Sequence, residues 1–343
     1  MRIAIVGGGI AGALLAWQLR RLAPGLSLEI FTGTAPGGAD ATAASGGLVR
    51  GFEVHPAACQ AAAASLAEIR ASATLRKWSG YREIGSVYLL PPGIDPGPSM
   101  ATVDRQLPGS AMVLGQAELA GYPFRDLPAG TLCVVERHAG FVSPAGLRAA
   151  ALAELAGAGA GIRSTPAVAV APHPAVRLAD GSTVDYDVVV VAAGAWTPRL
   201  LATSGVAATG LRTRQIQYTV CRPRLAGLGA FVDDTTGLYG RPVDLDSFLL
   251  GLPADRWDVD PATVVPDPDL VGEVAVRVLG RFGTSVRPGR TVASFDCYHD
   301  PPGLALRRST AGRALFTFTG GSGGAAKTAV AASRTAAQAL LAW

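Results

Sequence analysis

The sequence predicts an α/β fold in which a Rossmann-like domain with a parallel sheet carries an inserted α+β domain with an antiparallel sheet. Three observations support this prediction. The chain opens with an apolar run that leads directly into Gly7-x-Gly9-x-x-Gly12, four consecutive valines occupy positions 188–191, and the segments between these landmarks differ in composition. Such a valine run is typical of a central parallel strand that is buried on both faces.

The opening segment has the strand–turn–helix order that a dinucleotide-binding glycine turn requires. A strand is predicted from about residue 2, a helix up to residue 22 and a second strand over 26–32. Glycines at the turn let the backbone bend tightly and approach a pyrophosphate, which the positive end of the helix stabilises. We therefore expect Gly7, Gly9, Ile10, Ala11 and Gly12 to contact a dinucleotide.

The same domain is expected to resume near residue 140. A helix is predicted over 144–158 and strands over 165–171 and 175–178, and a turn at Asp180-Gly181 precedes the valine strand. A strand over 314–319, a glycine-rich turn and a helix over 325–341 complete the pattern. The predicted nucleotide-binding domain thus comprises residues 1–50, 140–205 and 290–343.

The remaining segments, 51–139 and 206–289, are expected to form the inserted domain. A helix over 56–78 is followed by short strands over 86–90, 215–221 and 247–252. Proline-rich stretches, including prolines 261, 266 and 268, are interpreted as connectors between them.

Composition limits the possible classes of function. The 343 residues are 49% hydrophobic and 16% charged, which favours a compact globular protein over a disordered one. A net charge of +4 without a basic block gives no support for a nucleic-acid or membrane partner. The four cysteines and four histidines lack metal-ligand spacing, so no metal site is expected. Since the first core strand begins almost at residue 1, we expect no signal peptide and a cytoplasmic location.

Five short segments form an ordered set that spans nearly the whole chain. They are Gly7–Gly12, Ser45-Gly46-Gly47-Leu48-Val49-Arg50, Gly140-Phe141-Val142-Ser143-Pro144, Ala192-Ala193-Gly194-Ala195-Trp196 and Gly320-Gly321-Ser322-Gly323-Gly324-Ala325-Ala326-Lys327. This set resembles the FAD-dependent D-amino acid oxidase superfamily, the DAO family. The resemblance is closest to its monomeric sarcosine oxidase branch, which includes oxidases of cyclic imino acids.

The resemblance implies FAD as the cofactor, held in a Rossmann-like domain of the GR2 type. The helix that follows the 320–326 turn is expected to direct its positive end at the flavin pyrimidine. At the end of the second strand, Thr32 replaces the family's acidic residue, and its hydroxyl can still bond a ribose. Further implied contacts come from Ser45, Gly46, Gly47, Val168, Ala193, Gly194, Trp196, Cys297, Gly321, Ser322, Gly323, Gly324, Ala325 and Lys327.

Four residues are implied at the substrate. Lys327 corresponds to a lysine that binds the substrate carboxylate, and Arg50 lies within about one residue of an active-site arginine. Tyr239 matches a tyrosine of the substrate pocket. Arg241 stands where an apolar aromatic is usual, so it either binds a second anionic group or is a surface arginine.

Two departures from the family pattern affect the chemistry. The branch links its flavin to a cysteine in a Cys-x-Tyr context, whereas Cys297 directly precedes Tyr298, so a covalent link and an ordinary buried cysteine both remain open. Leu249 occupies the position of the oxygen-activating lysine. Without that cation the reduction of O2 should be slower, so the acceptor is either O2, with Arg241 as a substitute cation, or another oxidant.

The resemblance implies an oxidoreductase that transfers hydride from the α-carbon of a secondary amine or cyclic imino acid to flavin N5, giving an imine, with a biosynthetic pathway as one setting. Three alternatives remain open. The chain could be a glycine or D-amino acid oxidase that acts on primary amines, a flavin dehydrogenase with a non-oxygen acceptor, or a flavoprotein subunit without turnover. A flavin hydroxylase is disfavoured, because Thr319-Gly320-Gly321-Ser322-Gly323 lacks the expected Gly-Asp.

Overall fold

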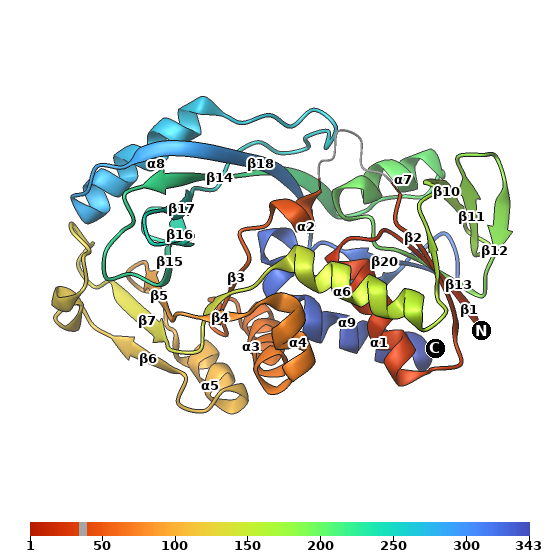
Figure 1. Cartoon of the computed structure of the whole chain (residues 1–343), viewed down its shortest axis with the longest axis horizontal. Helices are drawn as coiled ribbons and strands as arrows, with labels where there is room; N and C mark the ends of the chain where they lie inside the picture. Colours follow the sequence, from red (N-terminus) through yellow and green to blue (C-terminus); the bar gives the residue numbers. More distant parts are fainter. Residues whose placement is uncertain (34–39) are drawn as a thin grey trace.

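The computed structural model describes residues 1–33 and 40–343 and contains two large sheets, of six and eight strands (Figure 1). Figure 1 shows the six-stranded sheet at the right, the eight-stranded sheet at the left and most helices below and between them. The predicted α/β class, with a Rossmann-like sheet and a second, largely antiparallel sheet, is confirmed.

The six-stranded sheet has the order β19-β20-β13-β1-β2-β9, and its neighbours are parallel except for the β19–β20 pair. Its strands are β1 (Arg2–Val6), β2 (Ser27–Phe31), β9 (Gly161–Arg163), β13 (Val188–Val191), β19 (Ala305–Arg308) and β20 (Leu315–Thr319). The four valines of β13 are fully buried between β1 and β20, as their sequence predicts. Because parallel strands end at the same edge, the turns after β1, β13 and β20 meet there.

Helices and a small sheet cover the two faces of the six-stranded sheet. One face packs on α1 (Ile10–Leu22), α6 (Pro144–Gly157) and α9 (Ala325–Leu341), and α3 (Pro56–Ala71), α4 (Ala73–Ser79) and α5 (Gly97–Gln106) extend this layer. The other face packs on α7 (Thr197–Thr203) and on the antiparallel strands β10 (Ala167–Ala171), β11 (Ala175–Leu178) and β12 (Thr183–Asp185). This arrangement buries the sheet on both faces.

The eight-stranded sheet has the order β18-β14-β17-β16-β15-β5-β7-β6 and is antiparallel except for the β15–β5 pair. Its strands are β5 (Ser86–Leu90), β6 (Ala111–Leu114), β7 (Leu132–Glu136), β14 (Leu211–Arg222), β15 (Ala230–Asp233), β16 (Leu238–Pro242), β17 (Phe248–Gly251) and β18 (Arg287–His299). Helix α8 (Pro268–Phe282) contributes Val274, Val278 and Phe282 to its core. Along β14, side chains alternate between buried and less buried positions, as expected where the two faces differ.

Short elements connect the two large sheets. They are α2 (Ala41–Ala44), the three-stranded sheet of β3 (Leu48–Val49), β8 (Gly140–Phe141) and β4 (Arg82–Glu83), and the single turns η2 (Glu118–Gly121), η3 (Gly194–Trp196) and η4 (Ser322–Gly324). The sheet of β3, β8 and β4 holds the 45–50 segment against the chain near residue 140.

Two predictions of local structure were wrong or incomplete. The helix predicted over 56–78 is two helices, because Ser72 is extended and accepts a hydrogen bond from the Leu75 amide as the N-cap of α4. The stretch with prolines 266 and 268 is no mere connector, since α8 begins at Pro268 behind the N-cap Asp267. The proposed boundary at 290 falls inside β18, which pairs with β14 in the second sheet.

Within the described parts of the chain, none of the helices has both the length and the apolar character that a bilayer crossing requires.

Candidate active site

A cavity of about 360 Å³ is bounded on one side by the starts of α1 and α9 and the 45–50 segment, and on the other by β14, β16 and β18. Its walls bring together predicted residues that are far apart in the sequence. These are Ile10, Ser45, Gly46, Gly47, Arg50, Tyr239, Ser322, Gly323, Ala325 and Lys327. The start of α1, directly after the opening glycine turn, and the closing glycine turn therefore border one cavity.

The opening turn uses its three motif glycines in different ways. Gly7 has φ +123°, and a side chain there would lie 2.3 Å from the Ala192 carbonyl oxygen. A Cβ at Gly12 would lie 2.0 Å from the Gly7 carbonyl oxygen, so Gly12 allows α1 to pack on the turn. A Cβ at Gly9 would meet only the Thr42 hydroxyl, at 3.4 Å. The open side of Gly9, at the start of α1, fits a pyrophosphate that approaches the backbone closely.

The closing turn is shaped by two residues with left-handed backbone. Gly320 has φ +87°, and a Cβ there would lie 2.5 Å from that of His299. Ser322 has φ +53° although it is not glycine, and it lies on the cavity wall. Such conformations cost energy and are concentrated at functional sites. The N-cap of α9, Gly324, offers no side-chain cap, so the positive end of that helix faces the cavity at Ala325 and Ala326.

Lys327 and Arg50 form one buried ionic cluster with Glu53. The Glu53 Oε1 atom lies 2.8 Å from an Arg50 guanidinium nitrogen and 2.5 Å from the Lys327 Nζ atom. Burial, followed by the nearby Arg50 charge, lowers the pKa of Lys327. Burial acts to raise the pKa of Glu53, but Arg50 and Lys327 outweigh it and hold that pKa below its ordinary value. Two cations thus share one carboxylate beside the cavity.

A second pair of polar groups lies near this cluster. The Tyr88 hydroxyl donates a 2.6 Å hydrogen bond to the Asp234 carboxylate, and both residues line the cavity. The Arg50 guanidinium lies 4.9 Å from the centre of the Tyr88 ring. Burial raises the pKa of Asp234, although Tyr88 and Arg50 act in the opposite direction.

Tyr239 forms part of the wall contributed by the second sheet. Its hydroxyl donates a 3.1 Å hydrogen bond to the Gln217 carbonyl oxygen. Its ring covers the backbone of Gly251, where a Cβ would lie 2.4 Å from the ring. Gly251 therefore allows Tyr239 to lie flat at the cavity wall.

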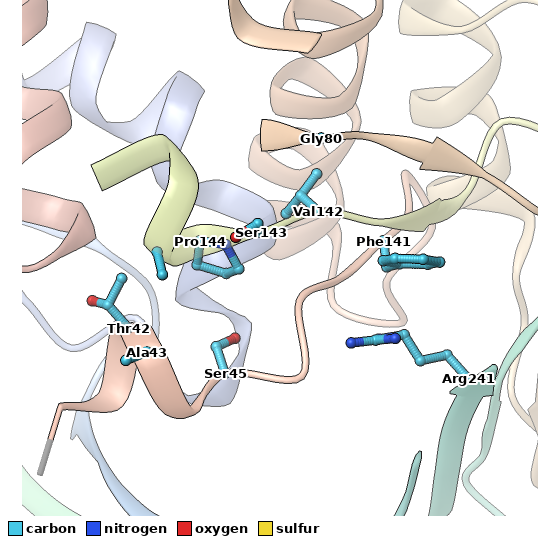
Figure 2. A pocket seen from close by; sticks show the side chains of 10 residues that line it. Thr42, Ala43, Ser45, Gly80, Phe141, Val142, Ser143, Pro144 and Arg241 are labelled. Carbon is cyan, nitrogen blue, oxygen red and sulfur yellow. The ribbon is translucent and has the colours of Figure 1, made fainter. Parts of the chain in front are cut away.

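Arg241 lines a neighbouring cavity of about 210 Å³ instead, which shares Thr42, Ser45 and Pro144 with the larger one. Figure 2 shows the Arg241 side chain extending along the face of Phe141, and its guanidinium carbon lies 4.3 Å from that ring centre. The guanidinium also donates a 2.6 Å hydrogen bond to the Gly46 carbonyl oxygen. Leu249, which pairs with Arg241 across the β16–β17 ladder, is buried.

Strand β18 turns Asp296 and Cys297 to opposite faces, as the alternation of a strand requires. Asp296 and Tyr298 line the cavity, whereas Cys297 is buried in a cluster with Ala195 and Phe295. The structure therefore places this thiol, for which both a flavin link and an ordinary buried position were open, outside the cavity wall. Burial raises the pKa of Asp296 to about 7.

Several predicted cofactor contacts lie outside the cavity wall. Ala193, Gly194 and Trp196 follow β13 at the edge of the sheet where β1 also ends, and Gly194 has φ +55°. The Thr32 hydroxyl donates to the Arg163 carbonyl oxygen at 3.1 Å. Val168 occupies a bulge in β10. Gly321 forms a bridge with Tyr298, and Gly324 packs on the Lys327 side chain.

Sequence reasoning missed Glu53, Asp234 and Asp296. Asp296 directly precedes Cys297, the candidate for flavin attachment. Because side chains alternate along a strand, only one of these two neighbours can face the cavity. For Glu53 the signal was its spacing of three residues from Arg50, because an acidic residue so close to a buried arginine is a natural partner.

Comparison with known protein families gives a match over nearly the whole chain. The family described as "DAO: FAD dependent oxidoreductase" matches residues 2–339. No curated protein is significantly similar in sequence.

Three solved structures illustrate the structural similarity. Iminodiacetate oxidase from Chelativorans sp. BNC1 has a TM-score of 0.75 at 20% identity, with 99% of this chain and 95% of that chain covered. L-proline dehydrogenase from P. horikoshii has a TM-score of 0.82 at 16% identity, with 99% and 92% covered. Glycine oxidase from Bacillus cereus ATCC 14579 has a TM-score of 0.73 at 18% identity, with 99% and 95% covered.

Proposed function

Because the chain belongs to the DAO family of FAD-dependent oxidoreductases, we propose that it oxidises an amino acid whose nitrogen is a secondary amine, giving an imine. FAD supplies the hydride acceptor, its N5 atom, for the hydrogen on the α-carbon. The observation that carries the proposal is the Arg50–Glu53–Lys327 cluster on a cavity that also touches the start of α1 and the closing glycine turn.

The turns fit FAD in complementary ways. The open side of Gly9 and the start of α1 suit the pyrophosphate, and the uncapped start of α9 suits the electron-rich end of the flavin ring. These features support FAD binding by backbone groups.

The ionic cluster provides charge for a substrate carboxylate. With Glu53 ionised, Lys327 and Arg50 retain one positive charge in excess, on the cavity side of the pair. A substrate carboxylate that binds there would lose its hydrating water and contact these two cations instead. Tyr239 would limit the space for the rest of the substrate. Lys327 and Arg50 would thus orient the α-carbon.

A secondary amine is supported by the similar structures. Two of them are named for an oxidase of iminodiacetate and a dehydrogenase of L-proline, both of which carry a secondary amine. Glycine oxidase is named for a primary amine, so primary amino acids are the second candidate.

We propose an acceptor other than O2 as the main oxidant. Leu249 is apolar and buried, and the Arg241 guanidinium is bound to the Gly46 carbonyl oxygen at the neighbouring cavity. Neither supplies a free cation to stabilise a superoxide-like intermediate, and such stabilisation is what speeds electron transfer to O2.

An anaerobic titration of the purified flavoprotein tests substrate and acceptor together. We expect sarcosine or L-proline to bleach the flavin at lower concentration than glycine or D-alanine, and air to restore the colour slowly. Preferential bleaching by the primary amines would favour the second candidate, and a colourless protein that takes up no FAD would favour a subunit without turnover.

The variant Lys327→Met tests the carboxylate site. Removing one of the two cations that would bind the substrate carboxylate should raise the half-saturating amino acid concentration about 10- to 100-fold, with FAD still bound. Arg277→Met, which removes an exposed arginine paired with Glu273 on α8, is the matched control. Unchanged saturation in Lys327→Met would remove this residue from the site.

A further inference from the structure

Asp296 is a buried acid on the cavity wall that the carboxylate site does not use. It is 9% exposed, and within residues 1–33 and 40–343 its Oδ2 atom has no hydrogen-bond partner. The same atom would lie 3.3 Å from a Cβ at Gly323, so it stands beside the closing glycine turn. A buried carboxylate oxygen without a partner is costly, and a ligand that donates a hydrogen bond removes this cost.

Among the residues that the structure describes, no charged group serves Asp296 as a counter-ion. Arg214 is its pairing partner on β14, but its guanidinium donates at 2.7 Å to the Ala254 carbonyl oxygen and lies against Trp257. Tyr239 and Tyr298 face Asp296 as neutral phenols, and burial raises the pKa of both. Of the other elements that pack on β18, α2, η3, η4 and β20 carry no titratable side chain, and the two arginines of α8 are paired with Glu273 and Asp233. The Cys297 thiol lies on the opposite face of β18.

The cavity therefore presents two kinds of charge. Lys327 and Arg50 offer positive charge for a carboxylate, and Asp296 offers an acceptor with no cation of its own. An amino acid zwitterion carries the complementary set, one carboxylate and one ammonium group.

We propose that Asp296 receives the amino group of the substrate, accepting a hydrogen bond from the bound ammonium and then its proton. The N–H bond of the ammonium breaks, the proton moves to a carboxylate oxygen of Asp296, and the nitrogen keeps the electron pair as the neutral amine. No oxidant is consumed in this step. The inference rests on the proposed function, because only the neutral amine has a lone pair to support loss of hydride from its α-carbon.

Burial favours this transfer. In a dry cavity an ion pair costs more than the corresponding neutral pair, so proximity to Asp296 shifts the proton from nitrogen to oxygen. Burial raises the pKa of Asp296 to about 7. This value is closer to the pKa of an amine than the pKa of an exposed carboxylate is.

Two unreactive probes of the same shape test the inference by equilibrium binding. Glycine betaine carries a permanent cation, and 3,3-dimethylbutanoate replaces that cation with a neutral tert-butyl group, while both keep the carboxylate. With the purified flavoprotein, calorimetry at pH 8.5 should show betaine binding at least tenfold more tightly. At pH 5.5, where the carboxyl is protonated, the two affinities should converge.

The variant Asp296→Asn should bind the two probes with a ratio near one at both pH values. Ser294→Ala is the matched control, because Ser294 is also buried on β18 and its hydroxyl has no partner among the described residues. This control should retain the wild-type preference and its pH dependence. Should Asp296→Asn fail to fold, Asp296→Ser is the second variant, and it should likewise bind the two probes with a ratio near one at both pH values.

The outcomes separate the inference from the proposed function. A betaine preference that survives in Asp296→Asn, or that is absent from the wild-type protein at pH 8.5, overturns the role of Asp296. A wild-type flavin that no amine reduces overturns the proposed function and, with it, the proton transfer. Reduction by secondary amines together with a lost betaine preference in Asp296→Asn supports both.

Discussion

Glu53 lies between two buried cations, so we expect its removal to lower the free energy of unfolding. Glu53→Gln would leave Arg50 and Lys327 facing each other without the carboxylate that they share. Removing one partner of a buried ion pair costs about 3–5 kcal/mol, because the remaining charge is uncompensated. We expect a decrease of that order in the free energy of unfolding, measured by urea denaturation monitored by circular dichroism.

The exposed pair of Arg277 and Glu273 on α8 provides the control for Glu53. Glu273→Gln should change the same free energy by less than about 1 kcal/mol, since an exposed pair contributes little. Equal effects of the two substitutions would contradict the interpretation of the Glu53 cluster.

Asp296 should make stability depend on pH in the opposite sense to an ordinary carboxylate. Its folded pKa, about 7, lies above its unfolded value, so the unfolded state loses its proton first as the pH rises. The stability that the protonated form contributes is therefore present below about pH 4 and is lost by pH 7. Asp296→Asn cannot ionise and should gain stability over the wild-type protein across this window, by up to about 4 kcal/mol.

Urea denaturation of both proteins at pH 5 and pH 8 measures this difference. The advantage of Asp296→Asn should be larger at pH 8. An advantage that is the same at both values would show that Asp296 titrates normally.

At the scale of elements, the opening turn combines Gly12, which packs closely on Gly7, with Gly9, which we propose to contact FAD. Gly9→Ala places a methyl group on the open side of the turn and should leave the unfolding free energy of the FAD-free protein within about 1 kcal/mol. The same methyl group should weaken FAD binding about tenfold or more, since a pyrophosphate needs close approach to this backbone. Fluorescence titration with FAD measures the change.

Gly12→Ala is the matched comparison within the same helix. Its methyl group would collide with the Gly7 carbonyl oxygen, so the FAD-free protein should be destabilised by a few kcal/mol. If Gly9→Ala and Gly12→Ala changed the stability and the FAD affinity equally, the separate roles that we assign to Gly9 and Gly12 would be wrong.

Much of the fold could be predicted because single elements carry strong local signals. The strand over 175–178 and the helix over 325–341 have the predicted bounds. The split at Ser72 was missed because one N-cap serine inside an Ala-rich stretch is weak against helix propensity. Helix α8 was missed because its prolines were taken as breakers, although proline at the first helical position is favourable.

The site was only partly predictable for a different reason. Sequence motifs singled out Lys327, Arg50 and Tyr239, which all line the cavity. In contrast, the face of the sheet on which Cys297 lies depends on the register of β18 against β14. Register is set by pairing across the sheet. A change in register of one residue would move every side chain of the strand to the opposite face. No local pattern around Cys297 contains that information.

The orientation of Cys297 leads to a prediction about the cofactor. Its thiol is buried against Ala195 and Phe295, and burial raises its pKa, which disfavours the reactive thiolate. We therefore expect FAD to be bound without a covalent link. Acid precipitation should release yellow FAD into the supernatant, whereas a pellet whose mass is increased by that of FAD would contradict this prediction.

At the scale of the whole molecule, the two sheets share a continuous core. One hydrophobic cluster contains Ile3 and Leu14 from the nucleotide-binding side together with Tyr88, Leu90 and Val134 from the second sheet. Units that share a core unfold together, because neither can lose its partner without exposing apolar surface.

We expect one cooperative thermal transition, seen at the same midpoint by far-ultraviolet circular dichroism and by tryptophan fluorescence. FAD at 100 times its Kd should stabilise the folded state by about 2.7 kcal/mol and raise this midpoint. Two well-separated transitions would show that the inserted segments fold independently of the Rossmann-like sheet.

The position of Glu53 also changes what an affinity for this cavity means. In the resting protein the chain supplies its own anion to Lys327 and Arg50, so an incoming acid competes with an internal occupant. A measured Kd for an amino acid would then include a contribution from Glu53, because the substrate must displace Glu53 from the two cations or share them with it. We therefore expect weakly binding anions to be disfavoured, because Glu53 already neutralises part of the positive charge when no substrate is bound.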